Sequence, residues 1–294
     1  MEVLVRSFAS FAASVVFIGV NISTYAAEKP AQDDPDFQFQ MGCKFYSATS
    51  RLRDYREAVH WLTKAAKQGH AKAQGLLGLC HSSGRGTPLS YEKAAHWLDL
   101  SAKKDDPIAQ YSLGVLYAIG QGVPKNSTMA AELYLKAAIQ GHPAAQTNMG
   151  TALERGDGVI LNLTEAARWY RKAAKQGYAT AQLNLGKMYA SGRGVNKDAS
   201  KAAEWYATAA EQDDARAQFL LGTCYYFGLG RPQDFVLAYT WIKLSAKNGC
   251  HTAQEYLPTA ADKLNPKQLS EAQRTIVARK AIQSTIQPSA TSKK

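Results

Sequence analysis

Ser101 and Lys104 are the residues whose types and spacing come closest to a known catalytic motif. The segment reads SAKK and matches SxxK, which supplies the serine nucleophile of penicillin-interacting enzymes. The SDN and KTG segments that accompany this motif are absent from the sequence. A weak β-lactam-binding hydrolase that uses Ser101 and Lys104 is therefore kept only as the alternative to a protein without catalysis.

Histidine and glycine patterns give no second catalytic or metal-binding candidate. The sequence contains no HExxH segment, no paired CxxC segments and no glycine-rich phosphate-binding loop. His60 and His96 occupy one position of a repeating pattern, and this favours a structural role. His70 and His142 occupy another such position. We expect no catalytic residue, no metal site and no cofactor.

Cys43 and Cys80 are the cysteine pair that the spacing brings together. They fall at nearly equivalent points of two neighbouring predicted helices. In an oxidising compartment they could form a disulfide, provided that their Cα atoms come within about 7 Å. The spacing of Cys224 and Cys250 gives no reason for these two to meet. Four free, buried thiols are the alternative.

These residues are embedded in a pattern that repeats every 36 residues. An Ala-Gln pair marks each repeat, and a glycine follows the glutamine by four residues in all but the last. The pairs begin at Ala73, Ala109, Ala145, Ala181, Ala217 and Ala253. One period earlier, Gln38 and Gly42 continue the register, so a degenerate first repeat precedes the others. Such periods are typical of stacked repeat proteins, in which each unit buries its apolar face against its neighbours.

Each repeat is predicted to form two helices. The first runs from the Ala-Gln pair to a pair of glycines, such as Gly120 and Gly122, which allow φ > 0 and end the helix. The second begins sixteen residues after the glutamine, where every repeat has a residue type that favours the N-cap. These residues are Asp54, Ser90, Asn126, Asn162, Asp198 and Asp234. The sequence thus predicts an all-α protein of stacked helix pairs.

The consensus AxAQxxLGxxYxxGxGVxxxxxxAAxWYxKAAxQG resembles that of the Sel-one-like repeat family, a relative of the tetratricopeptide repeat. Residues 181–214 show it most fully, and the resemblance covers residues 37–257. It implies a right-handed α/α solenoid that acts as a scaffold or adaptor for other proteins. Exported bacterial members are implicated in signalling regulation, envelope assembly and host interaction, and some have been linked to β-lactam binding.

The resemblance also implies a concave groove, lined by first-helix positions one, five and eight residues after the repeated glutamine. Aromatic and large apolar side chains at such positions are typical interface anchors. The predicted groove residues are Tyr46, Tyr111, Val115, Thr147, Glu154, Leu183, Lys187, Phe219 and Tyr226. Partial burial between neighbouring repeats is the alternative for each of them.

The N-terminal segment predicts export. An uncharged, mostly apolar stretch at residues 7–20 is short for a membrane helix and fits the apolar region of a signal peptide. Thr24 and Ala26 place small residues at the −3 and −1 positions of a cleavage site after Ala26. We therefore expect a periplasmic or secreted protein. An uncleaved signal, the one membrane contact expected, is the alternative.

The remaining segments complete the predicted layout. The segments are a signal peptide at 1–26, a linker at 27–36, repeats at 37–257, a C-terminal capping helix at 258–283 and a disordered basic tail at 284–294. Asn265 and Pro266 carry the signature of a helix start. The side chains expected to seal the end of the stack are Leu269, Ala272, Ile276 and Val277.

The charge balance limits the class of partner. The 294 residues include 35 Lys and Arg against 24 Asp and Glu, a formal net charge of +11. Such an excess attracts nucleic acids, anionic membranes or acidic proteins. Because export separates the protein from most nucleic acid, we expect a protein partner with an acidic surface or an envelope component, and no nucleic acid. The sequence does not predict the oligomeric state.

Overall fold

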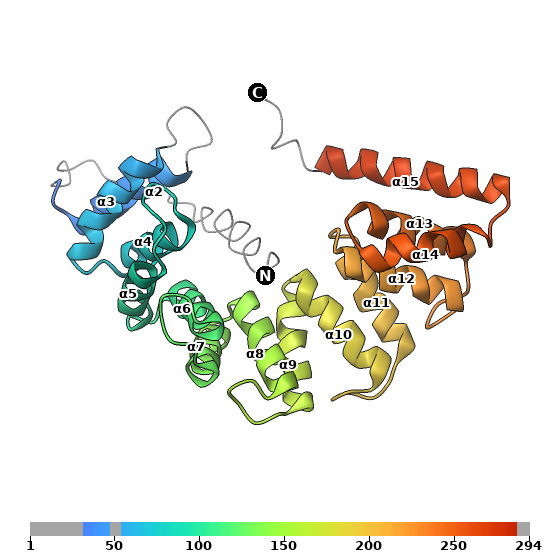
Figure 1. Ribbon diagram of the computed structural model, residues 1–294, viewed down its shortest axis with the longest axis horizontal. Helices are drawn as coiled ribbons and strands as arrows, with labels where there is room; N and C mark the ends of the chain where they lie inside the picture. Colours follow the sequence, from blue (N-terminus) through green and yellow to red (C-terminus); the bar gives the residue numbers. More distant parts are fainter. Residues whose placement is uncertain (1–31, 48–53, 287–294) are drawn as a thin grey trace, which may run out of the picture. The chain divides into compact units, whose positions relative to one another are not determined.

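The computed structural model describes residues 32–47 and 54–286, and every regular element in these ranges is an α-helix (Figure 1). The first helices of the repeats are α2 (Pro35–Ser47), α4 (Ala71–Ser83), α6 (Pro107–Ile119), α8 (Pro143–Arg155), α10 (Ala179–Ser191), α12 (Ala215–Phe227) and α14 (His251–Ala261). The second helices are α3 (Tyr55–Lys67), α5 (Tyr91–Ala102), α7 (Ser127–Ile139), α9 (Leu163–Lys175), α11 (Ala199–Ala210) and α13 (Phe235–Lys247). A final helix, α15 (Pro266–Ile286), follows. The prediction of an all-α solenoid of helix pairs is confirmed.

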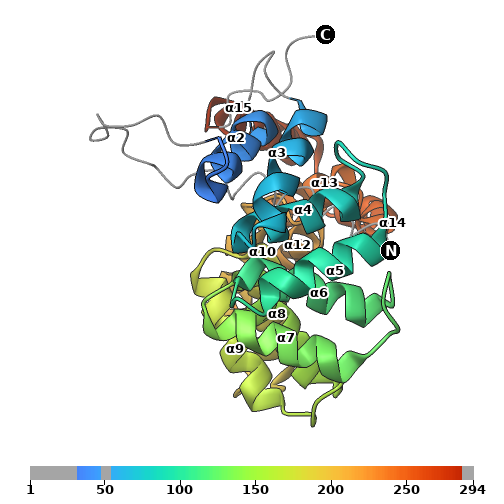
Figure 2. The ribbon, with the colours of Figure 1, turned by 90° about the vertical axis from the view of Figure 1, so that its left-hand side faces the viewer.

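The chain divides into two compact units, Met1–Ala145 and Gln146–Lys294, and each is described by itself. In the first unit, each helix from α2 to α7 packs against the next one along the chain. Figure 2 shows these helices following one another in chain order. In the second unit the same order runs from α9 to α14, and α15 packs on α13. Every repeat therefore buries its apolar face against its neighbours within a unit.

The second helices begin where the sequence predicts. In all six, the side chain of the predicted N-cap residue accepts a hydrogen bond from a backbone N–H of the first turn. Asp198, for example, accepts from the N–H of Lys201 at 2.9 Å. The first N–H groups of a helix have no partner within the helix, so this bond fixes the starting residue.

The glycine of the first helix allows the two helices of a pair to approach closely. A Cβ on Gly186 would lie 2.6 Å from Cε1 of Tyr206 on α11 and 3.3 Å from the carbonyl oxygen of Ala202. The second glycine of the two that end each first helix makes a different close contact. Gly194 has φ 69°, and a Cβ there would lie 2.2 Å from the carbonyl oxygen of Leu163 at the start of the preceding second helix. Both contacts require a residue without a side chain.

The repeated glutamine links three consecutive helices. The Nε2 of Gln182 on α10 donates to the carbonyl of Ala174 in α9 at 3.2 Å. Its Oε1 accepts from Nε2 of Gln212, just after α11, at 2.7 Å. The same acceptor bond joins residues 30 apart in four other repeats. These pairs are Gln38–Gln68, Gln110–Gln140, Gln146–Gln176 and Gln218–Asn248. We call this set of bonds the amide ladder.

The second repeat is an exception in the amide ladder. Lys104 stands at the position that donates elsewhere, and its Nζ bonds the carbonyl of Gly69 instead. The buried Oε1 of Gln74 is left without a hydrogen-bond partner. A buried acceptor without a donor lowers stability, so this is a weak point of the first unit.

The first helices begin two residues before the Ala-Gln pair, earlier than predicted. Their N-cap position, four residues before the glutamine, holds a histidine in two repeats. The N–H of Ala73 donates to Nδ1 of His70 at 3.0 Å, and the ring of Phe39 stacks on this imidazole at 4.5 Å. In the same way, Tyr111 stacks on His142 at 4.7 Å. Both histidines therefore have a structural role.

Helix α15 covers the end of the second unit. Its N-terminus forms as predicted, because the N–H of Gln268 donates to Oδ1 of Asn265 at 2.9 Å. The Arg279 guanidinium donates to both carboxylate oxygens of Glu211, at 2.8 and 2.9 Å, and lies 4.3 Å from the Trp241 ring centroid. Leu269, Ala272 and Ile276 pack inward. Val277 is 67% exposed, so its predicted part in the seal is wrong.

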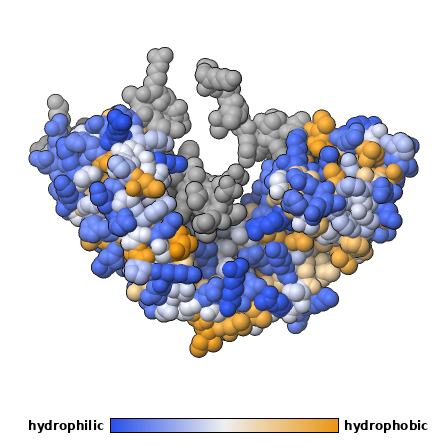
Figure 3. Space-filling model, in the orientation of Figure 1, coloured by the Kyte–Doolittle hydropathy of each residue, from blue (hydrophilic) through white to orange (hydrophobic). Residues whose placement is uncertain are grey.

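Several expectations fall on segments outside the described residues. The signal peptide at 1–26 and residues 287–294 of the predicted tail lie there, as do residues 27–31 of the linker. Helix α2 begins at Pro35, inside the predicted linker, and α15 ends at Ile286, inside the predicted tail. Among the described helices, none combines the length and apolar character needed to cross a membrane. The visible surface of the described residues is mostly hydrophilic (Figure 3).

The amide ladder yields a first prediction. We expect Gln218→Met to lower the free energy of unfolding by about 1–3 kcal/mol, because the Ala210 carbonyl and the Asn248 amide each lose a hydrogen bond to this buried side chain. Urea titration followed by circular dichroism measures this loss. Gln273→Met on the exposed side of α15 is the matched control and should change stability by about 0.5 kcal/mol or less. Equal effects of the two substitutions would contradict the ladder.

His142 yields a prediction about pH. Burial lowers its pKa to about 4, whereas an unfolded histidine titrates near 6.5. Between these values the unfolded chain binds a proton that the folded chain does not, so stability falls as the pH falls. From pH 7 to pH 5 we expect a loss of about 2 kcal/mol from this group. In urea titrations, His142→Asn should remove that part of the pH dependence, and His251→Asn on the exposed start of α14 should retain it.

Candidate functional site

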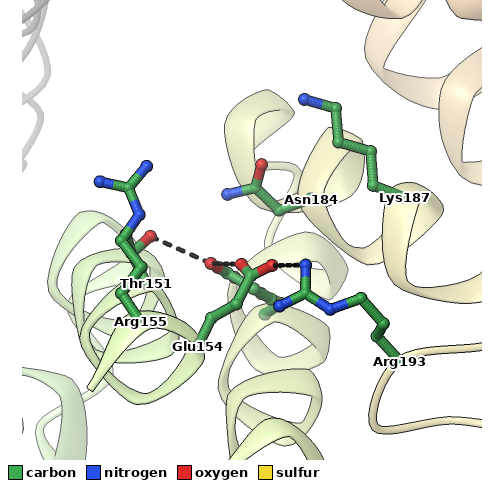
Figure 4. Close-up of a pocket in the computed structure, with 7 residues that line it drawn as sticks. Thr151, Glu154, Arg155, Asn184, Lys187 and Arg193 are labelled. Atoms are coloured by element: carbon green, nitrogen blue, oxygen red, sulfur yellow. Dashed lines mark hydrogen bonds and ion pairs between the residues drawn. The ribbon is translucent and has the colours of Figure 1, made fainter. Parts of the chain in front are cut away.

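A polar hollow of about 340 Å³ lies on the second unit (Figure 4). Three consecutive helices and one loop contribute to it, and we call it the basic hollow. Its lining residues are Thr151, Glu154 and Arg155 of α8, Tyr170 of α9, Asn184 and Lys187 of α10, and Arg193 in the loop after α10. The glycine pair that ends α10 places Arg193, since this residue lies between Gly192 and Gly194.

Glu154 is held in place from two sides. The Tyr170 hydroxyl donates to Oε2 of Glu154 at 2.8 Å, and Nη1 of Arg193 lies 3.1 Å from Oε1. The Tyr170 hydroxyl also lies 3.0 Å from Oγ1 of Thr151. Burial raises the pKa of the Tyr170 phenol, so it remains a hydrogen-bond donor at neutral pH. The carboxylate therefore orients Arg193 and has little capacity left for a ligand.

The basic hollow carries a net positive charge. Three lining residues are basic and one is acidic, a formal charge of +2. Among the described residues, no salt bridge engages Arg155 or Lys187. Partial burial, and then the nearby Arg216, lower the pKa of Lys187. An anion bound between these cations would be stabilised by both, and the Asn184 amide adds a further donor.

The nine predicted groove residues separate into two groups. Glu154 and Lys187 line the basic hollow, and Phe219 is half-buried with its ring 6.0 Å from Tyr256. The other six are buried within the stack. These are Tyr46, Tyr111, Val115, Thr147, Leu183 and Tyr226. This burial favours the alternative, in which these side chains pack between neighbouring repeats.

The burial of the first groove position has a physical reason. The residue after the glutamine packs on the N-cap residue of the next first helix, as Phe39 does on His70 and Tyr111 does on His142. Leu183 at this position is 0% exposed and belongs to a core cluster of the second unit. Such side chains vary between repeats because their packing partners vary, and they do not form an open surface.

Sequence reasoning missed most of the basic hollow. The residue types at the positions of Arg155, Asn184 and Arg193 differ between most repeats, so periodicity gives little signal for them. Tyr170 lies at a position that holds leucine, tyrosine or isoleucine in other repeats, and it reads as a core residue. The sequence does offer one signal, because charged residues stand at positions 154, 155, 187 and 193 of two neighbouring repeats.

Ser101 does not form a nucleophilic centre with Lys104. Ser101 is fully buried, and its Oγ lies 2.8 Å from the carbonyl oxygen of Ala71 and 3.1 Å from Oδ2 of Asp106. The Lys104 amine bonds the Gly69 carbonyl instead of the serine. Ser245, at the same position of the sixth repeat, makes the equivalent bond to Ala215. The hydroxyl thus has a structural partner, and nothing supports the β-lactam alternative.

The four cysteines are free thiols in the structure. Burial raises the pKa of Cys43 to about 11, of Cys80 to about 12 and of Cys224 to about 11. A Cys43–Cys80 disulfide stays a prediction. Within the described ranges, no three side chains of the metal-binding types His, Cys, Asp and Glu come together.

Comparisons with known proteins find one family. The Sel1 repeat matches six consecutive segments of the chain, which are 35–70, 71–106, 107–142, 143–178, 179–214 and 215–250. A search of curated proteins finds no match.

Two crystal structures are similar over most of the chain. One is c5321, a protective antigen present in uropathogenic Escherichia coli strains that displays an SLR fold, with 32% identity and a TM-score of 0.73. The match covers 84% of this chain and 54% of that one, so our chain spans about half the length of that relative. The other is a Sel1 repeat protein from Oxalobacter formigenes, with 35% identity, a TM-score of 0.70 and coverage of 75% and 86%.

The buried thiols yield a prediction about reactivity. In the native chain at pH 8 we expect iodoacetamide to alkylate Cys80 and Cys224 at least about 100-fold more slowly than in urea, because the thiolate is the reactive form. Peptide mass spectrometry measures both rates. Comparable rates in the two states would contradict the burial. If Cys43 and Cys80 react only after reduction, the predicted disulfide exists.

Proposed function

The chain belongs to the Sel1 repeat family, and from this premise we propose that it is an exported, non-catalytic scaffold that binds an acidic segment of a partner protein in the basic hollow. Proteins of this family are generally protein–protein interaction scaffolds. The finer proposal rests chiefly on one observation. Arg155, Lys187 and Arg193 line one concave site, and the nearby carboxylate of Glu154 is already bound.

The geometry of the basic hollow supports a side chain or peptide ligand of negative charge. Arg193 is fixed by Glu154, so its guanidinium loses little freedom when it binds. Arg155 and Lys187 extend away from Glu154 (Figure 4). Each of them can donate a charge-assisted hydrogen bond to a carboxylate of an acidic partner segment. Phe219 offers a partly exposed apolar side chain elsewhere on the same unit.

The proposal of export rests on the sequence of the N-terminal segment. The apolar stretch at residues 7–20, followed by small residues up to Ala26, supports a periplasmic or secreted location. In that compartment the net charge of +11 favours proteins with acidic surfaces as partners.

The basic hollow yields a prediction about partner binding. We expect Arg155→Glu combined with Lys187→Glu to reduce crosslinking to the native partner at least about tenfold, because two attractive charges become repulsive. Crosslinking in the native host, followed by mass spectrometry, measures the yield. Both side chains are exposed, so circular dichroism of the variant should match that of the wild type.

A matched control variant changes the net charge by the same amount at another place. Lys243→Glu combined with Lys247→Glu alters two exposed lysines of α13 that lie outside the hollow. This variant should retain the partner. An equal loss in both variants would show that only net charge matters and would refute a specific site. Turnover of a chromogenic β-lactam that disappears in Ser101→Ala would overturn the non-catalytic part of the proposal.

A further inference from the structure

Two apolar side chains project from the loop between α8 and α9. Ile160 is 90% exposed and Leu161 is 55% exposed, and neither is a member of a core cluster. Figure 3 shows an apolar patch at this loop. At the same positions in the next loop of the unit stand Asn196 and Lys197. The repeat therefore does not require apolar residues here.

The exposed face of α9 continues directly from this loop. Its buried face consists of alanines and two aromatic side chains that pack into the stack. Its exposed face carries Arg168, Lys172 and Lys175, spaced by four and three residues as one helical stripe requires. Leu161 lies in the loop, two residues before α9 begins at Leu163, and is exposed like these basic residues. We call Ile160, Leu161, Arg168, Lys172 and Lys175 the α9 edge.

The charge of this segment is positive on balance. Residues 157–175 hold four basic and two acidic residues, a net charge of +2. Glu165 is paired with Arg168 at 3.0 Å, and Arg171 donates to the Tyr189 hydroxyl at 3.1 Å. Lys175 takes part in no salt bridge among the described residues, and Lys172 lies 4.0 Å from the Trp169 ring centroid.

The next second helix of the unit lacks this stripe. On α11 the equivalent positions hold Glu204, Thr208 and Glu211, and Glu211 is bound by Arg279 of α15. The basic stripe of α9 therefore does not continue onto α11. What α9 presents is a narrow edge, apolar at its start and basic along its length.

We propose that the α9 edge docks on an anionic lipid surface. A projecting pair of apolar side chains can enter the boundary between lipid headgroups and acyl chains without a complementary pocket. The basic side chains along α9 contact anionic headgroups, and each contributes to binding. A protein partner would instead need a cavity shaped to receive Ile160. The ligand class is a bilayer that contains phosphatidylglycerol or a similar anionic lipid. This inference does not depend on the basic hollow.

Hydrogen exchange of the full chain with vesicles tests the proposal at the edge itself. Vesicles of phosphatidylcholine with about 30% phosphatidylglycerol should protect peptides within residues 157–175. Peptides of the α12–α13 loop, residues 228–234, should stay unprotected. Because the readout is local, any binding by the N-terminal apolar segment does not affect it. Neutral vesicles, or about 0.5 M salt, should reduce the protection.

Paired variants separate the apolar from the charged contribution. Ile160→Ser combined with Leu161→Ser should weaken local protection at least about tenfold, whereas Pro232→Ser combined with Gln233→Ser in the equivalent loop should not. Lys172→Gln combined with Lys175→Gln should weaken it, whereas Lys243→Gln combined with Lys247→Gln should not. All four variants change exposed or half-exposed side chains.

Three outcomes would overturn the proposal. The first is absence of vesicle-dependent protection in the wild type. The second is protection that persists when Ile160 and Leu161 are both serine. The third is protection of 157–175 by a soluble envelope extract but not by anionic vesicles, which would identify the edge as a protein-binding surface.

Discussion

The glutamine that recurs every 36 residues imposes the constraint on which the stack depends. Its amide is buried, and a buried amide lowers stability unless both its donor and its acceptor find partners. In Gln182 the donor reaches the preceding second helix, and the acceptor is met at the end of the following one. A helix pair alone lacks the first of these partners. The period without insertions from Gln38 to Gln254 follows from this requirement.

Local chemistry made much of the fold predictable from sequence. An N-cap oxygen and a glycine with φ > 0 act within a turn of their own backbone, so Asp198 and Gly192 are recognisable by residue type. The starts of the first helices are harder to predict. Their N-cap position also holds Tyr178 and Cys250, neither of which makes a side-chain cap bond. The partners in the amide ladder lie 30 residues apart, and composition alone does not pair them.

Variation between repeats proved an unreliable guide to the binding surface. The residue after the glutamine varies as a binding position does, yet it packs on the cap residue 31 positions later, as Phe39 does on His70. A change in the residue after the glutamine is thus matched by a change in the cap residue that it contacts. The exposed fraction of each side chain is what separates such pairs from true surface positions. By this measure, three of the nine predicted groove residues remain at the surface, namely Glu154, Lys187 and the half-buried Phe219.

The basic hollow depends on the core through Tyr170. Its ring occupies the space above Gly150, where a Cβ would lie 2.8 Å from Cδ1, and its hydroxyl holds Glu154. Glu154 in turn holds Arg193, which the glycines of the α10–α11 loop place beside it. Arg155, Lys187 and Asn184 take no part in the ladder, the caps or the helix-contact glycines. These positions can therefore change with the ligand while the register that builds the stack stays the same.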